Sequence, residues 1–233
     1  MSLAGFLKQW NRGEVKPEEK SFVVISGANM DFTHLTQIAR QAGIGNHETR
    51  YLRISMDSKR GQVLKYLRHI PQDTTLVGVL YGKTEGNTQH PVFGIAASDE
   101  DLDTIRTTLK KKGIEFEDIS EDDDVRFRMI HYQPELCQHP LFVHIEFPER
   151  AGAFLDFMER IADLASLCYF NYTYTGERVG RALVGMEFDT AEDRETIRKR
   201  MSAFSKNIIR SIREISPEAF QRIMGSRQLT GNH

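Results

Sequence analysis

The chain of 233 residues aligns with itself when it is shifted by 91 positions, and this internal repeat limits its fold more than any other feature. Residues 51–54 align with residues 142–145, and residues 61–64 align with residues 152–155, without a gap. The same shift pairs three further positions: Leu76 with Leu167, Tyr81 with Tyr172 and Gly94 with Gly185. Because these matches fall in one register, we interpret the chain as a duplicated domain.

Each copy predicts the same order of elements. In the first copy, residues 51–57 alternate with the period of two that is typical of a strand, and a glycine then opens a helix expected over 60–70. The pattern continues with strands near 74–82 and 91–97, a helix near 99–112 between an N-cap at Ser98 or Asp99 and a stop at Gly113, and a strand over 114–119. The order is βαββαβ, and both helices can cover one face of an antiparallel sheet.

The second copy repeats this order. Its elements are expected at 141–147 (strand), 152–163 (helix), 166–174 and 180–188 (strands), 191–204 (helix) and 207–214 (strand). Ser216 and Pro217 predict the N-cap and first residue of one more helix. We therefore predict an α+β protein with two tandem ferredoxin-like domains, at 48–125 and 126–225, and a disordered tail at 226–233. The acidic run 121–124 is interpreted as a solvated linker or helix start rather than a metal site.

Composition narrows the class of partners. The 31 basic and 33 acidic residues are well mixed and leave a net charge of −2, which gives no reason to expect nucleic acid or a membrane surface. No apolar run approaches the roughly 20 residues that span a bilayer, and the N-terminus lacks the features of a signal peptide. Cys137 and Cys168 are too few for a disulfide framework and are expected to be reduced thiols. We expect a soluble cytoplasmic protein.

The turn after the first strand of each copy is a candidate ligand site. Gly61 and Gly152 allow the backbone to approach a ligand closely, and the N–H groups at the start of the next helix suit a carboxylate. Arg60 and Arg150 would add a second attraction for an anion. The alternative is a tight turn with solvated arginines, and the pattern alone leaves both open.

Tyr81 and Tyr172 occupy matching positions at the end of the second strand. Each could be an amphipathic cover at a sheet edge, or could close an apolar pocket while its hydroxyl reaches a ligand.

Catalytic and metal-binding patterns are not found in the sequence. There is no P-loop, GxGxxG or GxSxG motif, and no pair of carboxylates stands out for acid–base chemistry. His131, Cys137, His139 and His144 lack a zinc-like spacing and are interpreted as linker and strand residues. We therefore predict no catalytic residue and no metal site.

Several motifs resemble one family. Residues 147–155 (FPERAGAFL), 170–173 (FNYT) and 179–185 (VGRALVG) resemble the regulatory domain of biosynthetic threonine deaminase (threonine ammonia-lyase), whose motifs are close to FPExPGAL, FHYR and YGRVLVG. Residues 24–32 (VISGANMDF) and 41–45 (QAGIG) resemble the end of that family's catalytic domain and the lead-in to its regulatory part. The resemblance covers about residues 3–224 and implies two ACT-like domains. It also implies that residues 1–47 are a small α/β remnant of a fold-type II pyridoxal-phosphate domain.

The resemblance implies an effector site, because the family's paired ACT-like units bind isoleucine, which inhibits, and valine, which opposes the inhibition. The tyrosine of the FHYR motif corresponds to Tyr172, and Tyr81 is its counterpart. The arginine that follows this tyrosine in the family is Thr173 here and Gly82 in the first copy. The residues expected to bind the effector are Arg60, Gly61, Tyr81, Arg150, Gly152, Ala153, Phe154, Asn171 and Tyr172.

The resemblance implies no cofactor for this chain alone, and pyridoxal phosphate only if a separate catalytic half is present. Ser26 matches the serine that faces the pyridine nitrogen of pyridoxal phosphate, but the lysine and the phosphate loop of that family have no counterpart here. We therefore expect an amino-acid-binding regulatory module for L-isoleucine or L-valine that is not catalytic alone and forms homo-oligomers. The alternatives are a subunit that completes a split threonine deaminase with a separate catalytic subunit, and a remnant that no longer binds an effector.

Overall fold

The computed structural model describes residues 2–16, 20–24, 49–70, 74–148, 150, 152–173 and 179–224. The chain divides into two compact units, residues 1–39 and 40–233. The first unit contains the helix α1 (Ser2–Asn11), on which Leu3, Leu7 and Trp10 are exposed. Ser26, most of the predicted catalytic-domain remnant and the predicted tail lie outside the described residues.

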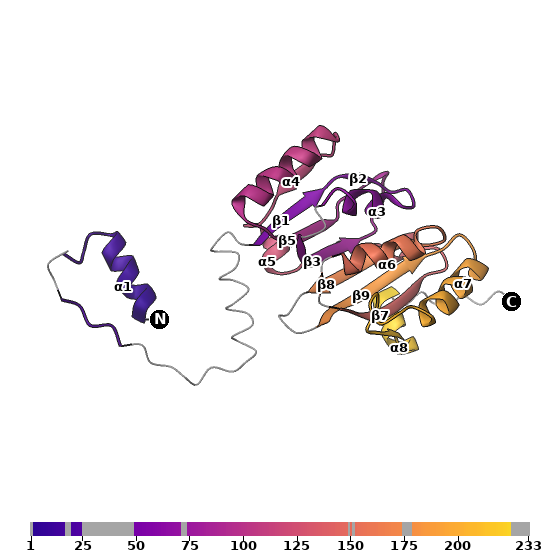
Figure 1. The fold of residues 1–233 in the computed structure, drawn as a ribbon. Coiled ribbons are helices and arrows are strands. Elements are labelled where there is room, and N and C mark those ends of the chain that lie inside the picture. Colours follow the sequence, from indigo (N-terminus) through magenta and orange to yellow (C-terminus); the bar gives the residue numbers. More distant parts are fainter. Residues whose placement is uncertain are drawn as a thin grey trace. The chain divides into compact units, whose positions relative to one another are not determined.

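The second unit contains the βαββαβ order twice, as Figure 1 shows along the chain. The elements of the first copy are β1 (Thr49–Ile54), α3 (Gln62–Leu67), β3 (Thr75–Gly82), β5 (Val92–Ala96), α4 (Asp99–Lys111) and β6 (Phe116–Asp118). Those of the second copy are β7 (Leu141–Pro148), α6 (Ala153–Ile161), β8 (Ser166–Thr173), β9 (Val179–Glu187), α7 (Ala191–Ser202) and β10 (Ser211–Glu214). A hairpin of β2 (Met56–Asp57) and β4 (Thr88–Gln89), the linker elements α5 (Asp123–Arg126) and η1 (Pro134–Leu136), and the final helix α8 (Pro217–Met224) complete the unit.

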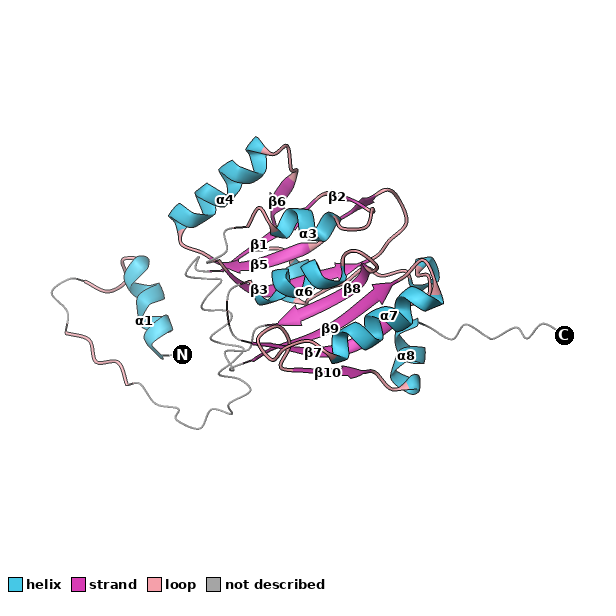
Figure 2. Ribbon diagram, turned by 45° about the vertical axis from the view of Figure 1, so that its right-hand side comes forward, coloured by secondary structure: helices cyan, strands magenta, loops and turns pink. Residues whose placement is uncertain are grey.

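The two copies share one antiparallel eight-stranded sheet, in the order β10-β7-β9-β8-β3-β5-β1-β6. The copies meet where β3 pairs with β8, and there Leu80 lies opposite Asn171, its own counterpart in the repeat. Above this point α3 and α6 lie side by side (Figure 2), and Arg68 donates to Glu159, also its counterpart, at 2.9 Å. A local two-fold axis therefore passes through the centre of the sheet and relates the copies.

The repeated glycines have a packing role in both copies. A Cβ atom on Gly94 would lie 2.6 Å from the ring of Tyr51, and one on Gly185 would lie 2.6 Å from the ring of Phe142. Tyr51 and Phe142 are themselves a matching pair in the repeat. In each copy, an aromatic ring from the first strand thus lies across a glycine of the third strand, which explains why these positions match.

The helices α3, α4, α6 and α7 cover one face of the sheet and enclose the main core, in which Ile105 and Phe157 are almost fully buried. The opposite face carries two smaller clusters. One contains Val125 of the linker, and the other contains Met224 of α8. The predicted α+β architecture is confirmed, and the sheet is continuous across both copies.

Local predictions vary in accuracy. Ser98 caps α4 by accepting from the Asp101 N–H at 3.2 Å, and Gly113 follows this helix at φ +66, both as predicted. The first-copy helix is shorter than predicted, because it starts only after the left-handed Gly61 and ends at Leu67. Residues 207–210 do not belong to the last strand, since the Ile208 N–H donates back to Ser205 in a turn.

Candidate functional site

The two loops predicted to bind a ligand have the same backbone conformation. Gly61 has φ +78 and Gly152 has φ +74, values that side-chain-bearing residues rarely adopt, and each glycine immediately precedes a helix. Glycine is therefore needed at both positions to turn the chain from the first strand into the helix. This requirement alone does not distinguish a ligand site from a tight turn.

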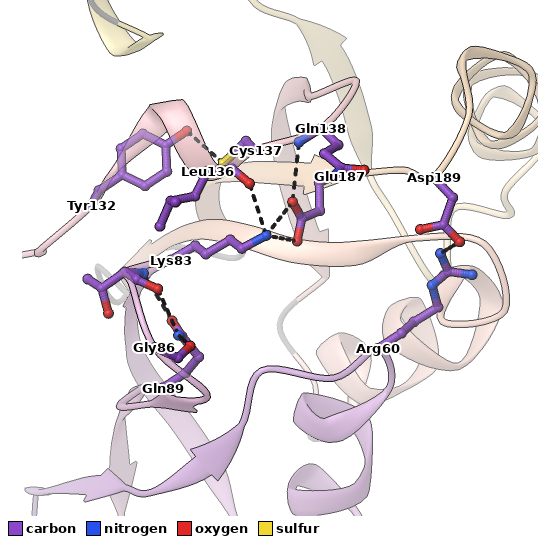
Figure 3. Close-up of polar contacts among 11 residues, drawn as sticks. Arg60, Lys83, Gly86, Gln89, Tyr132, Leu136, Cys137, Gln138, Glu187 and Asp189 are labelled. Carbon is purple, nitrogen blue, oxygen red and sulfur yellow. Dashed lines mark hydrogen bonds and ion pairs between the residues drawn. The ribbon is translucent and has the colours of Figure 1, made fainter.

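The arginines of these loops make different contacts. Arg60 forms an ion pair with Asp189 of the second copy (Figure 3) and donates to the carbonyl oxygen of Asp163 at 3.3 Å. Arg150 remains within its own copy, where it pairs with Asp156 and donates twice to the carbonyl oxygen of Asn207, at 3.0 and 2.8 Å. Of these two arginines, Arg60 connects the copies.

A cleft of about 400 Å³ lies beside Arg60 at the junction of the two copies. Lys83 places its ammonium group 2.7 Å from both carboxylate oxygens of Glu187 and 3.1 Å from the carbonyl oxygen of Leu136 (Figure 3). The side chains of Lys83 and Glu187 are only 22% and 14% exposed, so water screens this pair less than a surface ion pair. The lining residues are Ser58, Arg60, Lys83, Gln138, Ser166, Glu187, Phe188 and Asp189.

Tyr81 lies two residues before Lys83 and is buried. Burial, followed by the nearby Cys168 thiol and Glu187 carboxylate, raises the pKa of Tyr81, so its phenol stays protonated at neutral pH. The interpretation of Tyr81 and Tyr172 as covers at a sheet edge is wrong, because β3 and β8 pair at the centre of the sheet.

Tyr172 belongs to an aromatic group of the second copy. Its ring lies across Gly180, where a Cβ atom would be 2.4 Å from the phenol oxygen, and is almost perpendicular to Phe147 at 6.2 Å. Phe154 stacks on Phe170 with a centroid distance of 4.5 Å. Ala153 and Phe154 are both buried, so they contribute to the core beneath the start of α6.

Asn171 points to the other face of the sheet, as alternation along β8 requires. Its side-chain oxygen accepts from Arg128 of the linker, which also donates to the carbonyl oxygen of Tyr172 at 2.9 Å. The linker also crosses Gly82, where a Cβ atom would lie 2.2 Å from the carbonyl oxygen of His131. No side chain fits there, which gives a steric reason why the first copy has no arginine after its tyrosine.

Three charged residues of the cleft, Lys83, Glu187 and Asp189, were not predicted from the sequence. Each is a common charged residue outside any motif, and each reaches the cleft only because β3 pairs with β8. The repeat could have located them if the pairing of the copies had been known.

A second hollow lies on the opposite face of the first copy. This groove of about 650 Å³ lies beside Arg53, which pairs with Glu117 and Asp124. Of the predicted site residues, Tyr81 alone lines it. Among the described residues, no three His, Cys, Asp or Glu side chains could together hold a metal ion, and no helix could cross a membrane.

A family model for the C-terminal regulatory domain of threonine dehydratase matches residues 137–211, from the residue after η1 to the first residue of β10. The match lies within the second copy, which is thus similar to the C-terminal regulatory domain of threonine dehydratase. The predicted resemblance to the C-terminal part of this family is thereby confirmed.

Curated threonine dehydratases align with most of this chain. The biosynthetic L-threonine dehydratase of Haemophilus influenzae is 23% identical over 198 residues, which are 84% of this chain and 38% of the relative. The mitochondrial threonine dehydratase of Schizosaccharomyces pombe is 24% identical, over 80% of this chain and 32% of its own length. The Escherichia coli enzyme is 24% identical, with shares of 84% and 39%. The chain thus spans less than two fifths of the length of these relatives.

Proposed function

We propose that this chain is an effector-sensing regulatory module of the threonine dehydratase type, which binds L-isoleucine or L-valine and is not catalytic on its own. The match of the second copy to a regulatory domain supports this proposal, as does the same βαββαβ order in the first copy. The proposal treats residues 48–125 and 126–225 as two ACT-like domains that act together, in a chain that forms homo-oligomers.

The observation that carries the proposal is the pairing of opposite charges around the cleft. An amino acid is a zwitterion, and the cleft offers Arg60 and Lys83 for its carboxylate and Asp189 and Glu187 for its ammonium group. The volume of about 400 Å³ lies within the range of roughly 300–1,000 Å³ that is common for small-molecule sites.

Binding at this cleft would also provide a mechanism of regulation. The ion pair between Arg60 and Asp189 joins the two copies. A ligand that binds one of these side chains in place of the other therefore changes the contact between the copies. A ligand shifts an equilibrium between two arrangements by its difference in affinity for them. The carboxylate of Glu187 helps to raise the pKa of the buried Tyr81, so a ligand that engages Glu187 would also change the electrostatic surroundings of Tyr81.

The start of α6 is proposed as a second effector site. Arg150, Gly152, Ala153, Phe154 and Tyr172 belong to the second copy's version of the same loop and strand. Asn171 lies on the other face of β8, so it would influence this second site indirectly, through the backbone that it shares with Tyr172.

The test is calorimetric titration of the full chain with L-isoleucine, L-valine and L-threonine. Saturable heat with isoleucine or valine, and none with threonine, is the expected result. At about 100 times its dissociation constant, the effector should stabilise the fold by about 2.7 kcal/mol, and each kcal/mol should raise the melting midpoint by roughly 2–4 °C. Absence of heat and of any melting shift with all three amino acids would refute the proposal.

A matched pair of variants tests the cleft itself. Arg60→Gln should weaken effector binding by about tenfold or more, because it removes a charge-assisted contact worth more than about 1.4 kcal/mol. Arg68→Gln removes another contact between the copies, to Glu159, but lies outside the cleft. It should change the affinity by less than about twofold, and equal losses in both variants would place the site elsewhere.

A further inference from the structure

The only two cysteines of the chain come together on the face of the sheet that α8 covers. Cys137 follows η1 in the linker and Cys168 lies on β8, and both belong to one buried cluster with Ile215 and Met224. Neither forms a disulfide, and each thiol influences the pKa of the other. The fold therefore brings two free thiols into one buried cluster although 31 positions separate them in the sequence.

Lys83 fixes both segments that carry the thiols. Its backbone N–H donates to the carbonyl oxygen of Cys168 at 2.8 Å, while its ammonium group donates to the carbonyl oxygen of Leu136, directly before Cys137, at 3.1 Å. On the other side of Cys137, the Gln138 N–H donates to a carboxylate oxygen of Glu187 at 3.4 Å. Cys137 thus lies beside the ion pair that lines the cleft (Figure 3), and the backbone of Cys168 is hydrogen-bonded to Lys83 of the same pair.

The two thiols have different surroundings. The neighbouring Cys168 thiol, together with the Tyr132 hydroxyl at 3.5 Å, lowers the pKa of Cys137 despite its burial. Burial raises the pKa of Cys168, which is fully inaccessible, whereas Cys137 keeps 6% of its surface exposed. Because the thiolate is the nucleophile, Cys137 would react first.

We propose that Cys137 and Cys168 form a thiol–disulfide exchange site that accepts a small-molecule disulfide, with Cys137 as the attacking thiol and Cys168 as the resolving thiol. In the first step, the Cys137 thiolate forms a bond to one sulfur of the small disulfide, whose sulfur–sulfur bond breaks, and one thiolate leaves. In the second step, the Cys168 sulfur attacks the Cys137 sulfur, and the second small thiol leaves with the proton of the Cys168 thiol. The two cysteines are oxidised to a disulfide, and the small disulfide is reduced to two thiols.

The disulfide would tie the linker to β8 beside Lys83 and Glu187. Its effect on the cleft rests on the proposed function, whereas formation of the disulfide does not. We expect oxidation to weaken isoleucine binding by about threefold or more, because it restricts the ion pair that the ligand must displace.

The test is incubation of the folded full chain with oxidised glutathione, followed by intact mass measurement and a thiol count in denaturant. The mass of the expected product is lower by two hydrogen atoms, and the product has no free thiol in denaturant. Its peptide map contains a disulfide link between Cys137 and Cys168. A chain that keeps both thiols, or carries glutathione without the internal link, would overturn the proposal.

Single variants test the assigned roles. Cys168→Ser should stop at a mixed disulfide of glutathione with Cys137, whereas Cys137→Ser should leave Cys168 unmodified in the folded protein. Melting scans establish that each variant is folded, with Cys168→Ala as the substitute if the serine hydroxyl is not tolerated in the core. Rapid modification of Cys168 in folded Cys137→Ser would contradict the order of attack. Titration of the oxidised and reduced wild-type chains with isoleucine is a separate readout, so failure of effector binding is distinguishable from failure of thiol exchange.

Discussion

The first helix of each copy begins at the same position of the repeat, but the arginine nearest to it occupies a different position in each copy and makes different contacts. Arg60 reaches Asp189 and Asp163 in the other copy, whereas Arg150 closes a loop within its own copy. The shared backbone conformation at Gly61 and Gly152 shows that duplication preserved the turn while the side chains around it diverged. A matching backbone is therefore weak evidence for a matching site.

The cores beneath these turns have diverged as well. The aromatic residues Phe147, Phe154 and Phe170 surround the start of α6. Their counterparts in the first copy are the aliphatic residues Met56, Val63 and Val79, all of which are buried. Tyr172 thus packs against aromatic rings of its own copy, whereas the first copy has aliphatic residues at the equivalent positions. Truncating equivalent side chains should therefore lower the free energy of unfolding by different amounts in the two copies.

The largest effect is expected from truncating the aromatic core. Phe170→Ala should destabilise the fold by about 3–5 kcal/mol, because Phe170 is fully buried and stacks on Phe154. Val79→Ala, the matched change in the first copy, should cost less, about 1.5–3 kcal/mol. Urea denaturation of both variants measures the difference. Equal costs would mean that the cores of the two copies are energetically equivalent.

Restoring the arginine that follows the tyrosine in the family should again destabilise the two copies by different amounts. Gly82→Arg should cost about 3 kcal/mol or more, because its Cβ atom would lie 2.2 Å from the His131 carbonyl oxygen of the linker. Thr173→Arg replaces a half-buried side chain at the equivalent position and should cost less than about 1 kcal/mol. Thermal melting of the two variants is the measurement, and a mild effect of Gly82→Arg would show that the linker can move away.

Alanine substitution at the two left-handed glycines should destabilise the fold by the same amount in either copy. Gly61→Ala and Gly152→Ala should each destabilise the fold by about 1–2 kcal/mol, because a Cβ atom disfavours positive φ. Neither site has a heavy atom close enough to clash, since the nearest, on the Arg150 side chain, would lie 3.9 Å from a Cβ atom on Gly152. A much larger cost at one glycine, measured by urea denaturation, would indicate a further constraint on that loop.

The sequence predicted most of the fold but only part of the site. The periodicity of the hydrophobic residues, together with the internal repeat, located five elements to within a few residues: β3, β5, α4, β7 and α6. Each of these elements has a pattern of hydrophobic residues within its own segment. The pairing of β3 with β8 is not encoded in a local pattern, so the position of Tyr81 and Tyr172 at the centre of the sheet could not be predicted. For the same reason Arg60 was identified but its partner Asp189, far away along the chain, was not.

The smallest predicted effect concerns the outer strands. In each copy, an arginine of the second helix binds a carboxylate of the last strand. Arg106 of α4 donates to Asp118 of β6 at 2.8 Å, and Arg198 of α7 donates to Glu214 of β10 at 2.9 Å. Asp118 is the better enclosed, because the hydroxyl and the N–H of Ser120 also donate to it, at 2.6 and 3.1 Å. Asp118→Asn should therefore cost about 1 kcal/mol at neutral pH, and Glu214→Gln less.

The pH dependence of the destabilisation by Asp118→Asn tests whether this destabilisation is electrostatic in origin. Burial alone would raise the pKa of Asp118, but hydrogen bonds from Ser120 and the Arg106 guanidinium outweigh burial and lower it. A carboxylate with a lowered pKa in the folded state binds its proton more readily in the unfolded chain, where its pKa is near 3.9. Its contribution is therefore fully present above that value and is lost as the pH falls through the folded pKa. The difference in unfolding free energy between wild type and Asp118→Asn should be constant from pH 7 to about pH 5 and should then narrow towards pH 3. A difference that stays constant down to pH 3 would mean that Asp118 contributes through shape alone, as an amide would.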